Sequence, residues 1–206
     1  MKNAIVFDLG AVVFRWQPRS LLKQVFADKA PDEGQIGLWV ADIFRGFTAQ
    51  SEWGQFDMGV LGIEQVAARI AARSTLSIDE LESFIHAIPN HLQPIPETVA
   101  LIERLNQAGH TLYYLSNMPA PFAAQLLKAN DFARWFRDGI FSSDVGMIKP
   151  QADIFRLAQH RFGLDAPVFI DDSVKNVDMA LELGWRAIRF DSAEQVAQEL
   201  SSCYEF

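Results

Sequence analysis

The chain has 206 residues, of which half are hydrophobic, and its formal net charge is −8 at pH 7. This length and composition predict a folded globular protein, either one large domain or a domain with an inserted lobe, and they exclude a disordered chain. No cluster of lysine and arginine resembles a footprint for a phosphate backbone, which excludes nucleic acids and anionic membranes as expected partners but leaves a small anionic substrate open.

The cysteine count and the first residues bear on the cellular location of the protein. Cys203 is the single cysteine, so no intrachain disulfide and no cysteine-based zinc site is expected. Residues 1–3 lead directly into an apolar segment without the pattern of a signal peptide, and no apolar run is long enough to cross a bilayer. We therefore expect a cytoplasmic protein.

Short apolar runs that end in small or acidic residues mark the expected strands. In chain order they cover residues 4–7, 111–115, 139–141, 168–170 and 187–190. Each run is followed by a helical pattern or a loop, and this alternation predicts an α/β fold with a parallel sheet. Prolines and glycines mark the helix ends: Pro96 begins a helix toward Gly109, Pro150 lies just inside the start of one that ends near Gly163, and Gly184 follows another.

Residues 17–91 read as entirely helical. Apolar residues in the segment 63–73 recur at the spacing of one helix face, and Ser77 with Glu80 three positions later has the pattern of a capping box. The proline-rich stretch 88–94 marks the return of this segment to the strands. We predict a helical cap that can close over a site as a lid.

The chain therefore divides into a doubly wound α/β core, residues 1–16 and 92–206, and a helical cap, residues 17–91. Ligands of such a core bind at the carboxyl ends of the strands.

Acidic residues follow two of the expected strands. Asp8 comes directly after the first, and Asp171-Asp172 end the fourth. Asp8 by itself fits a turn residue, and Asp172 fits a helix cap, although Ser173 is the better candidate for that cap. Together the carboxylates would repel one another at one sheet edge, and Mg²⁺ with oxygen ligands is the simplest compensation. We therefore predict a Mg²⁺ site.

Two further segments supply groups that suit a phosphate. Ser116-Asn117 ends the second strand with a hydroxyl, an amide and free backbone N–H groups. Lys149-Pro150 places an ammonium just before an expected helix N-terminus, which is unfavourable unless an anion is present. With Asp8 as a covalent nucleophile, these groups describe a site for phosphoryl transfer.

Four motifs in this order resemble the haloacid dehalogenase superfamily, and the resemblance covers essentially the whole chain. Phosphatases of this superfamily attack phosphate through an aspartate and have a cap between the first and second motifs. The motifs are Phe7-Asp8-Leu9-Gly10, Leu115-Ser116-Asn117, Lys149-Pro150 and Ile170-Asp171-Asp172-Ser173.

The resemblance implies a role for each matching residue. Asp8 matches the nucleophile that becomes aspartyl-phosphate and binds Mg²⁺, and the Gly10 carbonyl matches a second metal contact. Asp172 matches the main acidic metal ligand, with Asp171 as a direct or water-mediated helper. The phosphate-binding positions correspond to Ser116, Asn117 and Lys149, and Lys149 also stabilises the nucleophile.

Gly10 departs from most phosphatases of the superfamily, which have an aspartate there as general acid and base. Loss of such a group typically costs about 10²–10⁴ in rate. The substrate's leaving group needs little protonation, or another group supplies the proton, or the site binds phosphate without useful turnover. A subgroup of small bacterial sugar-phosphate phosphatases, resembling the glucose-1-phosphate phosphatase type, also has Asp-Leu-Gly here, which favours the first two readings.

The sequence therefore predicts a Mg²⁺-dependent phosphatase acting on a small phosphorylated metabolite, with a sugar phosphate as the most favoured substrate. The alternatives are a non-catalytic phosphate-binding or regulatory protein and a 2-haloacid dehalogenase, against which the paired acids Asp171 and Asp172 argue. Trp16, Trp53 and Phe56 are candidates for the inner face of the cap. The oligomeric state is open between monomer and homodimer.

Overall fold

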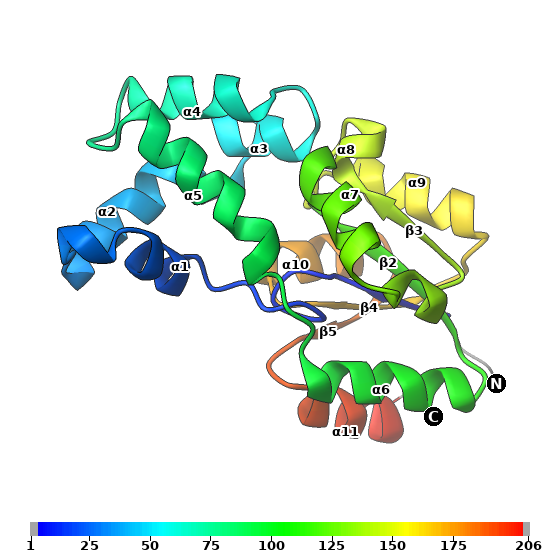
Figure 1. Ribbon diagram of the computed structural model, residues 1–206. Helices are drawn as coiled ribbons and strands as arrows, with labels where there is room; N and C mark the ends of the chain where they lie inside the picture. The colour runs from blue at the N-terminus through cyan, green and yellow to red at the C-terminus, as the bar shows by residue number, and fades with distance from the viewer. Residues whose placement is uncertain (1–3, 204–206) are drawn as a thin grey trace.

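The computed structural model describes residues 4–203, which form a parallel sheet flanked by helices (Figure 1). Residues 1–3 and 204–206, at the ends of the predicted core, and the side chain of Cys203 lie outside the described residues. The strand order is β3-β2-β1-β4-β5, and every pair is parallel. The strands are β1 (Ala4–Phe7), β2 (Thr111–Ser116), β3 (Asp138–Phe141), β4 (Val168–Asp171) and β5 (Arg186–Arg189).

All the predicted strands are confirmed, each within a residue of its expected bounds. The doubly wound class is confirmed as well, because alternate residues of β1 face opposite hydrophobic clusters. Ile5 and Phe7 pack with apolar residues of α6 (Pro96–Gln107) and α11 (Ala193–Cys203) on one face. Val6 packs on the other face with residues of α9 (Ala152–Phe162) and α10 (Val174–Glu182). Burial on both faces explains why these strands read as continuous apolar runs.

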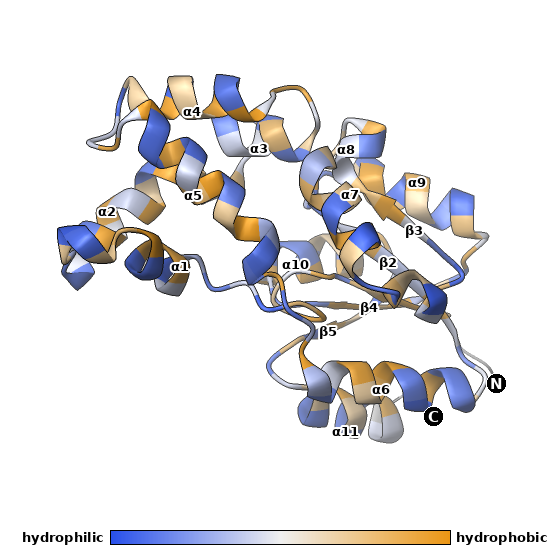
Figure 2. Cartoon of the chain, viewed as in Figure 1, coloured by the Kyte–Doolittle hydropathy of each residue, from blue (hydrophilic) through white to orange (hydrophobic). Residues whose placement is uncertain are grey.

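Between β1 and β2 the chain leaves the sheet and forms a layer of helices, in the upper left of Figure 1. We call residues 17–91 the helical insert; its division from the core at these residues stays a prediction. Figure 2 shows hydrophobic and hydrophilic residues alternating along α4 and α5, as expected for helices with one buried face. The helices are α1 (Pro18–Val25), α2 (Glu33–Phe44), α3 (Glu52–Asp57), α4 (Ile63–Ala71) and α5 (Ile78–His91), with short 3₁₀ turns at Ala27–Lys29 and Arg45–Phe47.

The capping box at the start of α5 is confirmed. The Ser77 hydroxyl accepts a hydrogen bond from the Glu80 N–H at 3.3 Å, and the Glu80 carboxylate accepts one from the Ser77 N–H at 2.8 Å. The predicted linker at 88–94 begins too early, because α5 continues through Pro89 to His91. The tertiary contacts of the buried face, including Ile85 and Ile88, hold this last turn in a helix that proline alone disfavours.

The two chain crossings between sheet and insert are joined by backbone hydrogen bonds. The Arg15 N–H donates to the Gln93 carbonyl and the Ile95 N–H donates to the Val13 carbonyl, both at 2.8 Å. The outgoing and returning segments thus form a paired connection rather than two independent linkers.

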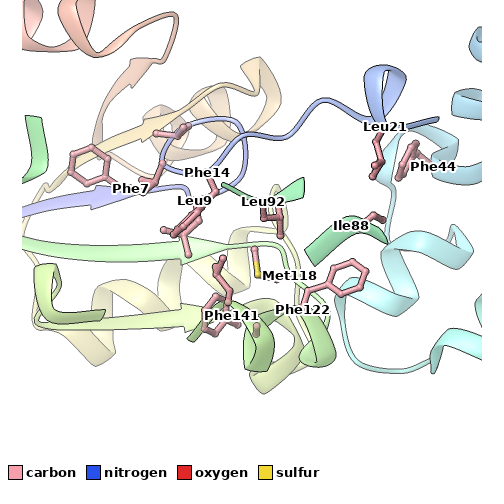
Figure 3. Packing of buried hydrophobic residues seen from close by; sticks show 14 of the residues in the cluster. Phe7, Leu9, Phe14, Leu21, Phe44, Ile88, Leu92, Met118, Phe122 and Phe141 are labelled. Atoms are coloured by element: carbon pink, nitrogen blue, oxygen red, sulfur yellow. The ribbon is translucent and has the colours of Figure 1, made fainter. Parts of the chain in front are cut away.

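The remaining elements are α7 (Ala120–Ala129), a 3₁₀ turn at Phe132–Trp135 and α8 (Ser142–Val145). Helix α7 follows β2 and α8 follows β3 at the carboxyl edge of the sheet, whereas the 3₁₀ turn precedes β3 at the amino edge. One hydrophobic cluster extends from the sheet into the insert, and Figure 3 shows Met118 and Phe122 of the core near Ile88 of α5. No helix within residues 4–203 is long and apolar enough to span a membrane.

Candidate active site

A cavity of about 540 Å³ lies where the helical insert meets the carboxyl edge of the sheet. Its lining contains charged residues from the core and from α3 of the insert, together with apolar residues from both layers. The charged lining residues are Asp8, Asp57, Lys149, Asp172 and Lys175. The structure thus brings together residues that the sequence placed at the ends of separate strands.

Asp8, Lys149 and Asp171 form a buried ion-pair network at the edge of the sheet. The Lys149 ammonium lies 2.9 Å from Asp8 Oδ1 and 2.6 Å from Asp171 Oδ2, and its side chain is 1% exposed. Parallel pairing of β1 with β4 places both carboxylates at the same edge. A buried cation shared by two carboxylates offsets part of the cost of desolvating them.

This arrangement corrects the prediction for Lys149-Pro150. Helix α9 begins at Ala152, so Pro150 precedes it rather than lying inside its first turn. The ammonium is compensated by Asp8 and Asp171, not by an anion at a helix N-terminus.

Asp171 is held by several donors at once. Its Oδ1 accepts from the Ser173 N–H at 2.8 Å, and the Asn176 amide contacts both carboxylate oxygens at 3.0 Å. With the contact to Lys149 added, both of its oxygens are engaged. Each oxygen of Asp171 thus already accepts two hydrogen bonds, which leaves little free capacity for a further ligand.

The surroundings raise the pKa values of Asp8, Asp172 and Lys149, for different reasons. Burial raises the pKa of Asp8 to about 7; Lys149 lowers it, while Asp171 and Asp172 raise it further. Burial and then the charge of Asp171 raise the pKa of Asp172. For Lys149, burial lowers the pKa, but the carboxylates of Asp171 and Asp8 outweigh burial and raise it above its ordinary value. The excess of negative charge calls for a further cation.

The acidic residues fit a Mg²⁺ ion. Carboxylate oxygens of Asp8, Asp171 and Asp172 all lie within 4.8 Å of one another, and Asp172 is exposed at the cavity. Gly10 also lines the cavity, and no donor within residues 4–203 hydrogen-bonds to its carbonyl. Small hard cations prefer oxygen-only ligands such as these.

Asn117 and Ser116 have different surroundings. The Asn117 side chain donates to the Lys149 carbonyl at 2.9 Å and accepts from the Lys149 N–H at 2.8 Å. This amide therefore positions the lysine segment, which leaves the backbone of Asn117 for an anion. Ser116 is buried at the end of β2, directly before Asn117, and does not line the cavity itself.

Of the three aromatic residues predicted for the inner face of the cap, two line the cavity and one does not. Trp16 and Trp53 line the cavity. Phe56 does not; its ring packs edge-on against Trp53 at 5.6 Å and against Phe122 at 5.4 Å. Phe56 thus supports the lining from behind. Further apolar lining residues are Phe47, Ile88, Leu92, Met118, Phe122 and Val174.

Asp57, the last residue of α3, is a buried acidic lining residue to which the sequence assigned no catalytic role. It is 3% exposed, and burial, reinforced by the charge of Asp8, raises its pKa well above the ordinary value. The sequence did contain a signal for this role: an acidic residue lies in an aromatic-rich stretch of the insert, while position 10 has no acidic residue.

Comparison with known proteins places this site in a family. The family model described as haloacid dehalogenase-like hydrolase matches residues 2–184. The chain belongs to the haloacid dehalogenase-like hydrolases. The predicted resemblance and the prediction of a hydrolase are thereby confirmed, while the glucose-1-phosphate phosphatase subgroup stays a prediction.

Three curated relatives of this hydrolase illustrate the range of the family. It is 26% identical to the sesquiterpene phosphatase astK of Aspergillus oryzae, over 96% of this chain and 94% of the relative. It is 27% identical to the drimenol cyclase drtB of Aspergillus calidoustus, over 99% of this chain but 37% of the relative. It is 34% identical to the phosphoglycolate phosphatase of Escherichia coli K12, over 43% of this chain and 36% of the relative.

Solved structures share the fold at low sequence identity. A HAD family enzyme of Bacteroides thetaiotaomicron, crystallised with magnesium and inorganic phosphate, has a TM-score of 0.69 at 20% identity, covering 93% of this chain and 96% of its own. L-2-haloacid dehalogenase of Xanthobacter autotrophicus has a TM-score of 0.65 at 20% identity, covering 99% and 84%. Both comparisons support the α/β fold described above.

Proposed function

We propose that this hydrolase is a Mg²⁺-dependent phosphomonoesterase in which Asp8 attacks the phosphorus and becomes an aspartyl-phosphate. The observation that carries the proposal is the Asp8 carboxylate at the wall of the cavity, held by Lys149 and grouped with two more acids. Residues 17–91 act as the cap over this cavity in our proposal.

The chain's own groups would each contribute to the reaction. Lys149 holds Asp8 in place and supplies positive charge for the phosphate. The Asn117 backbone orients phosphate oxygens, and Ser116, predicted from the sequence to bind phosphate, supports it from its buried position at the end of β2. Asp8, Asp172 and the Gly10 carbonyl would hold Mg²⁺, with Asp171 behind them. The ion supplies charge neutralisation of the phosphate when bound.

The paired acids favour phosphate over a haloacid. A dehalogenase binds an anionic substrate without a metal, and uncompensated carboxylates at Asp171 and Asp172 would repel it. Both sequence alternatives, the dehalogenase and the phosphate-binding protein without turnover, remain as outcomes of the experiment below.

The sugar phosphate predicted from the sequence stays a prediction, and the cavity favours a second candidate. Beyond the charged end, the lining consists largely of aromatic and aliphatic side chains, with few groups to hydrogen-bond sugar hydroxyls. Such a wall suits a phosphate ester with an apolar organic group, and the relative in Aspergillus oryzae is named a sesquiterpene phosphatase. The cytoplasmic location and the oligomeric state also stay predictions.

A substrate panel with and without Mg²⁺ tests the proposal. We expect Mg²⁺-dependent phosphate release, loss of activity in Asp8→Asn and loss of Mg²⁺ dependence in Asp172→Asn. Asp79→Asn, an exposed acid of α5, is the matched control and should keep wild-type activity. Glucose 1-phosphate and a prenyl monophosphate in the panel decide between the two substrate classes. Phosphate binding without turnover would support the regulatory protein, and halide release from 2-haloacids without metal would support the dehalogenase.

A further inference from the structure

The proposed reaction lacks a proton donor at the position where most related phosphatases have one. Gly10 has no side chain, so the departing alcohol oxygen must take its proton from elsewhere when the leaving group is an alkoxide. The argument that follows rests on the proposed phosphatase function.

Most titratable groups of the cavity are already assigned. Lys149 is engaged by two carboxylates, Asp8 is the nucleophile, and Asp172 is a metal ligand in the proposal. Lys175 is exposed at the start of α10. The titratable group of the described lining that is both buried and unassigned is Asp57.

Asp57 lines the cavity with a side chain that has no polar partner among the described residues. The residue is 3% exposed and lines the same cavity as Asp8. Among residues 4–203, no hydrogen bond or ion pair engages the Asp57 side chain. Burying a carboxylate in this way without a partner is costly, so the surroundings favour the protonated carboxyl group, which is the form that a general acid needs.

The backbone of Asp57 is fixed to the core. Its carbonyl accepts a hydrogen bond from the Ser142 hydroxyl at 2.5 Å, and the same hydroxyl accepts from the Met118 N–H at 2.8 Å. Gly59, at φ +72°, brings the following turn so close that a Cβ there would lie 3.0 Å from the Ser143 carbonyl oxygen. These contacts hold the end of α3 against the core at the edge of the cavity.

We infer that Asp57 is the general acid and base of this enzyme, supplied by the helical insert in place of the side chain missing at Gly10. In the first step an Asp8 oxygen bonds to phosphorus and the bond from phosphorus to the leaving oxygen breaks. That oxygen keeps the bonding electron pair and takes the Asp57 proton, so an alcohol departs and Asp57 becomes a carboxylate.

In the second step the Asp57 carboxylate takes a proton from water as the water oxygen bonds to phosphorus. The bond from phosphorus to the Asp8 oxygen breaks, its electron pair returns to Asp8, and inorganic phosphate is released. Both residues end in their starting protonation states, so the cycle balances without a further reactant.

The test compares two substrates of similar size in Asp57→Asn. The phenolate of p-nitrophenyl phosphate leaves without protonation, whereas the alkoxide of benzyl phosphate needs a proton. The quantity measured is kcat/KM, which reports the reaction up to departure of the leaving group. We expect it to fall about 10²–10⁴-fold for benzyl phosphate and less than about tenfold for p-nitrophenyl phosphate. Asp79→Asn is the matched control and should change neither value.

A second variant separates catalysis from structure. A Cβ built on Gly10 meets no atom within 4 Å, so a side chain can be introduced at this position without a clash at its first atom. Gly10→Asp in the Asp57→Asn background should restore benzyl phosphate turnover by at least about tenfold, because a proton donor returns from the other side of the cavity. The melting temperature and inhibition by inorganic phosphate should stay close to wild type in Asp57→Asn.

Equal losses for the two substrates, no loss for either, or no rescue by Gly10→Asp would overturn the assignment of Asp57. These results are distinct from failure of the proposed function, in which the wild-type protein hydrolyses neither substrate with Mg²⁺ present.

Discussion

Lys149→Met removes the buried ammonium and keeps a side chain of similar length. In the native protein this ammonium contacts carboxylate oxygens of Asp8 and Asp171 at 2.9 and 2.6 Å, and the residue is 2% exposed. Methionine fills the space but leaves two carboxylates in the sheet edge without their cation.

The expected cost follows from that burial. Removing one partner of a buried ion pair leaves an uncompensated charge and typically costs about 3–5 kcal/mol. Repacking a side chain of conserved volume adds less than about 1.5 kcal/mol. We therefore expect the free energy of unfolding at neutral pH, without metal, to fall by about 3–5 kcal/mol in Lys149→Met.

The loss of unfolding free energy in Lys149→Met should depend on pH. Asp8 has a folded-state pKa of about 7, raised above its ordinary value, so its proton favours the folded state at low pH. That contribution is lost as the pH rises through the folded-state pKa. Lys149 lowers the pKa of Asp8, so in Lys149→Met the folded-state pKa of Asp8 rises further. The variant therefore loses more unfolding free energy than the wild type as the pH rises. The difference between variant and wild type should be small at about pH 5 and largest at about pH 8.

Urea unfolding followed by circular dichroism measures this difference at both pH values. Lys175→Met, an exposed lysine at the same cavity, is the control and should stay within about 0.5 kcal/mol of wild type. A loss below about 1 kcal/mol at neutral pH, or the same loss at low and high pH, would contradict the proposed compensation of two carboxylates by one lysine.

Two further pairs of substitutions test packing contacts, the first where the insert meets the core and the second within the insert. Ser142→Ala leaves a buried backbone N–H and carbonyl without their shared hydroxyl and should cost about 1–3 kcal/mol in urea unfolding. Ser143→Ala removes a buried hydroxyl that has no partner in the described chain and should be neutral or stabilising. Gly54→Ala places a Cβ 1.9 Å from a backbone oxygen and should cost about 1–3 kcal/mol, whereas Gly37→Ala, with its nearest contact at 3.8 Å, should be stabilising; equal effects would refute this reasoning.

The strands and the chemistry at their ends could be predicted because they depend on local pattern. Apolar runs such as 4–7 and 168–170 are buried on both faces of a parallel sheet, and polar residues begin where the strands end. The sequence therefore placed Asp8 and Asp171 at one edge before any contact was known. The end of α5 was missed because proline at position 89 argues against a helix and only packing of the buried face keeps it.

Side-chain direction at the site required the tertiary structure. Asn117 was expected to face a phosphate, but the loops that carry it and Lys149 lie together, and the amide bonds the Lys149 backbone instead. Phe56 was expected at the inner face of the insert, but the packing of its ring against Phe122 places it behind the lining.

The sequence by itself determined the family, the sheet and the acids at its edge, because these follow from residue order and short-range periodicity. The tertiary structure alone decided that Lys149 lies between Asp8 and Asp171 and that Asp57 reaches the cavity from the insert. Asp57 and Asp8 are far apart along the chain, and no local pattern encodes their approach. It arises from the packing of α3 against the turn at Ser142, where burial and a single hydroxyl join the two layers.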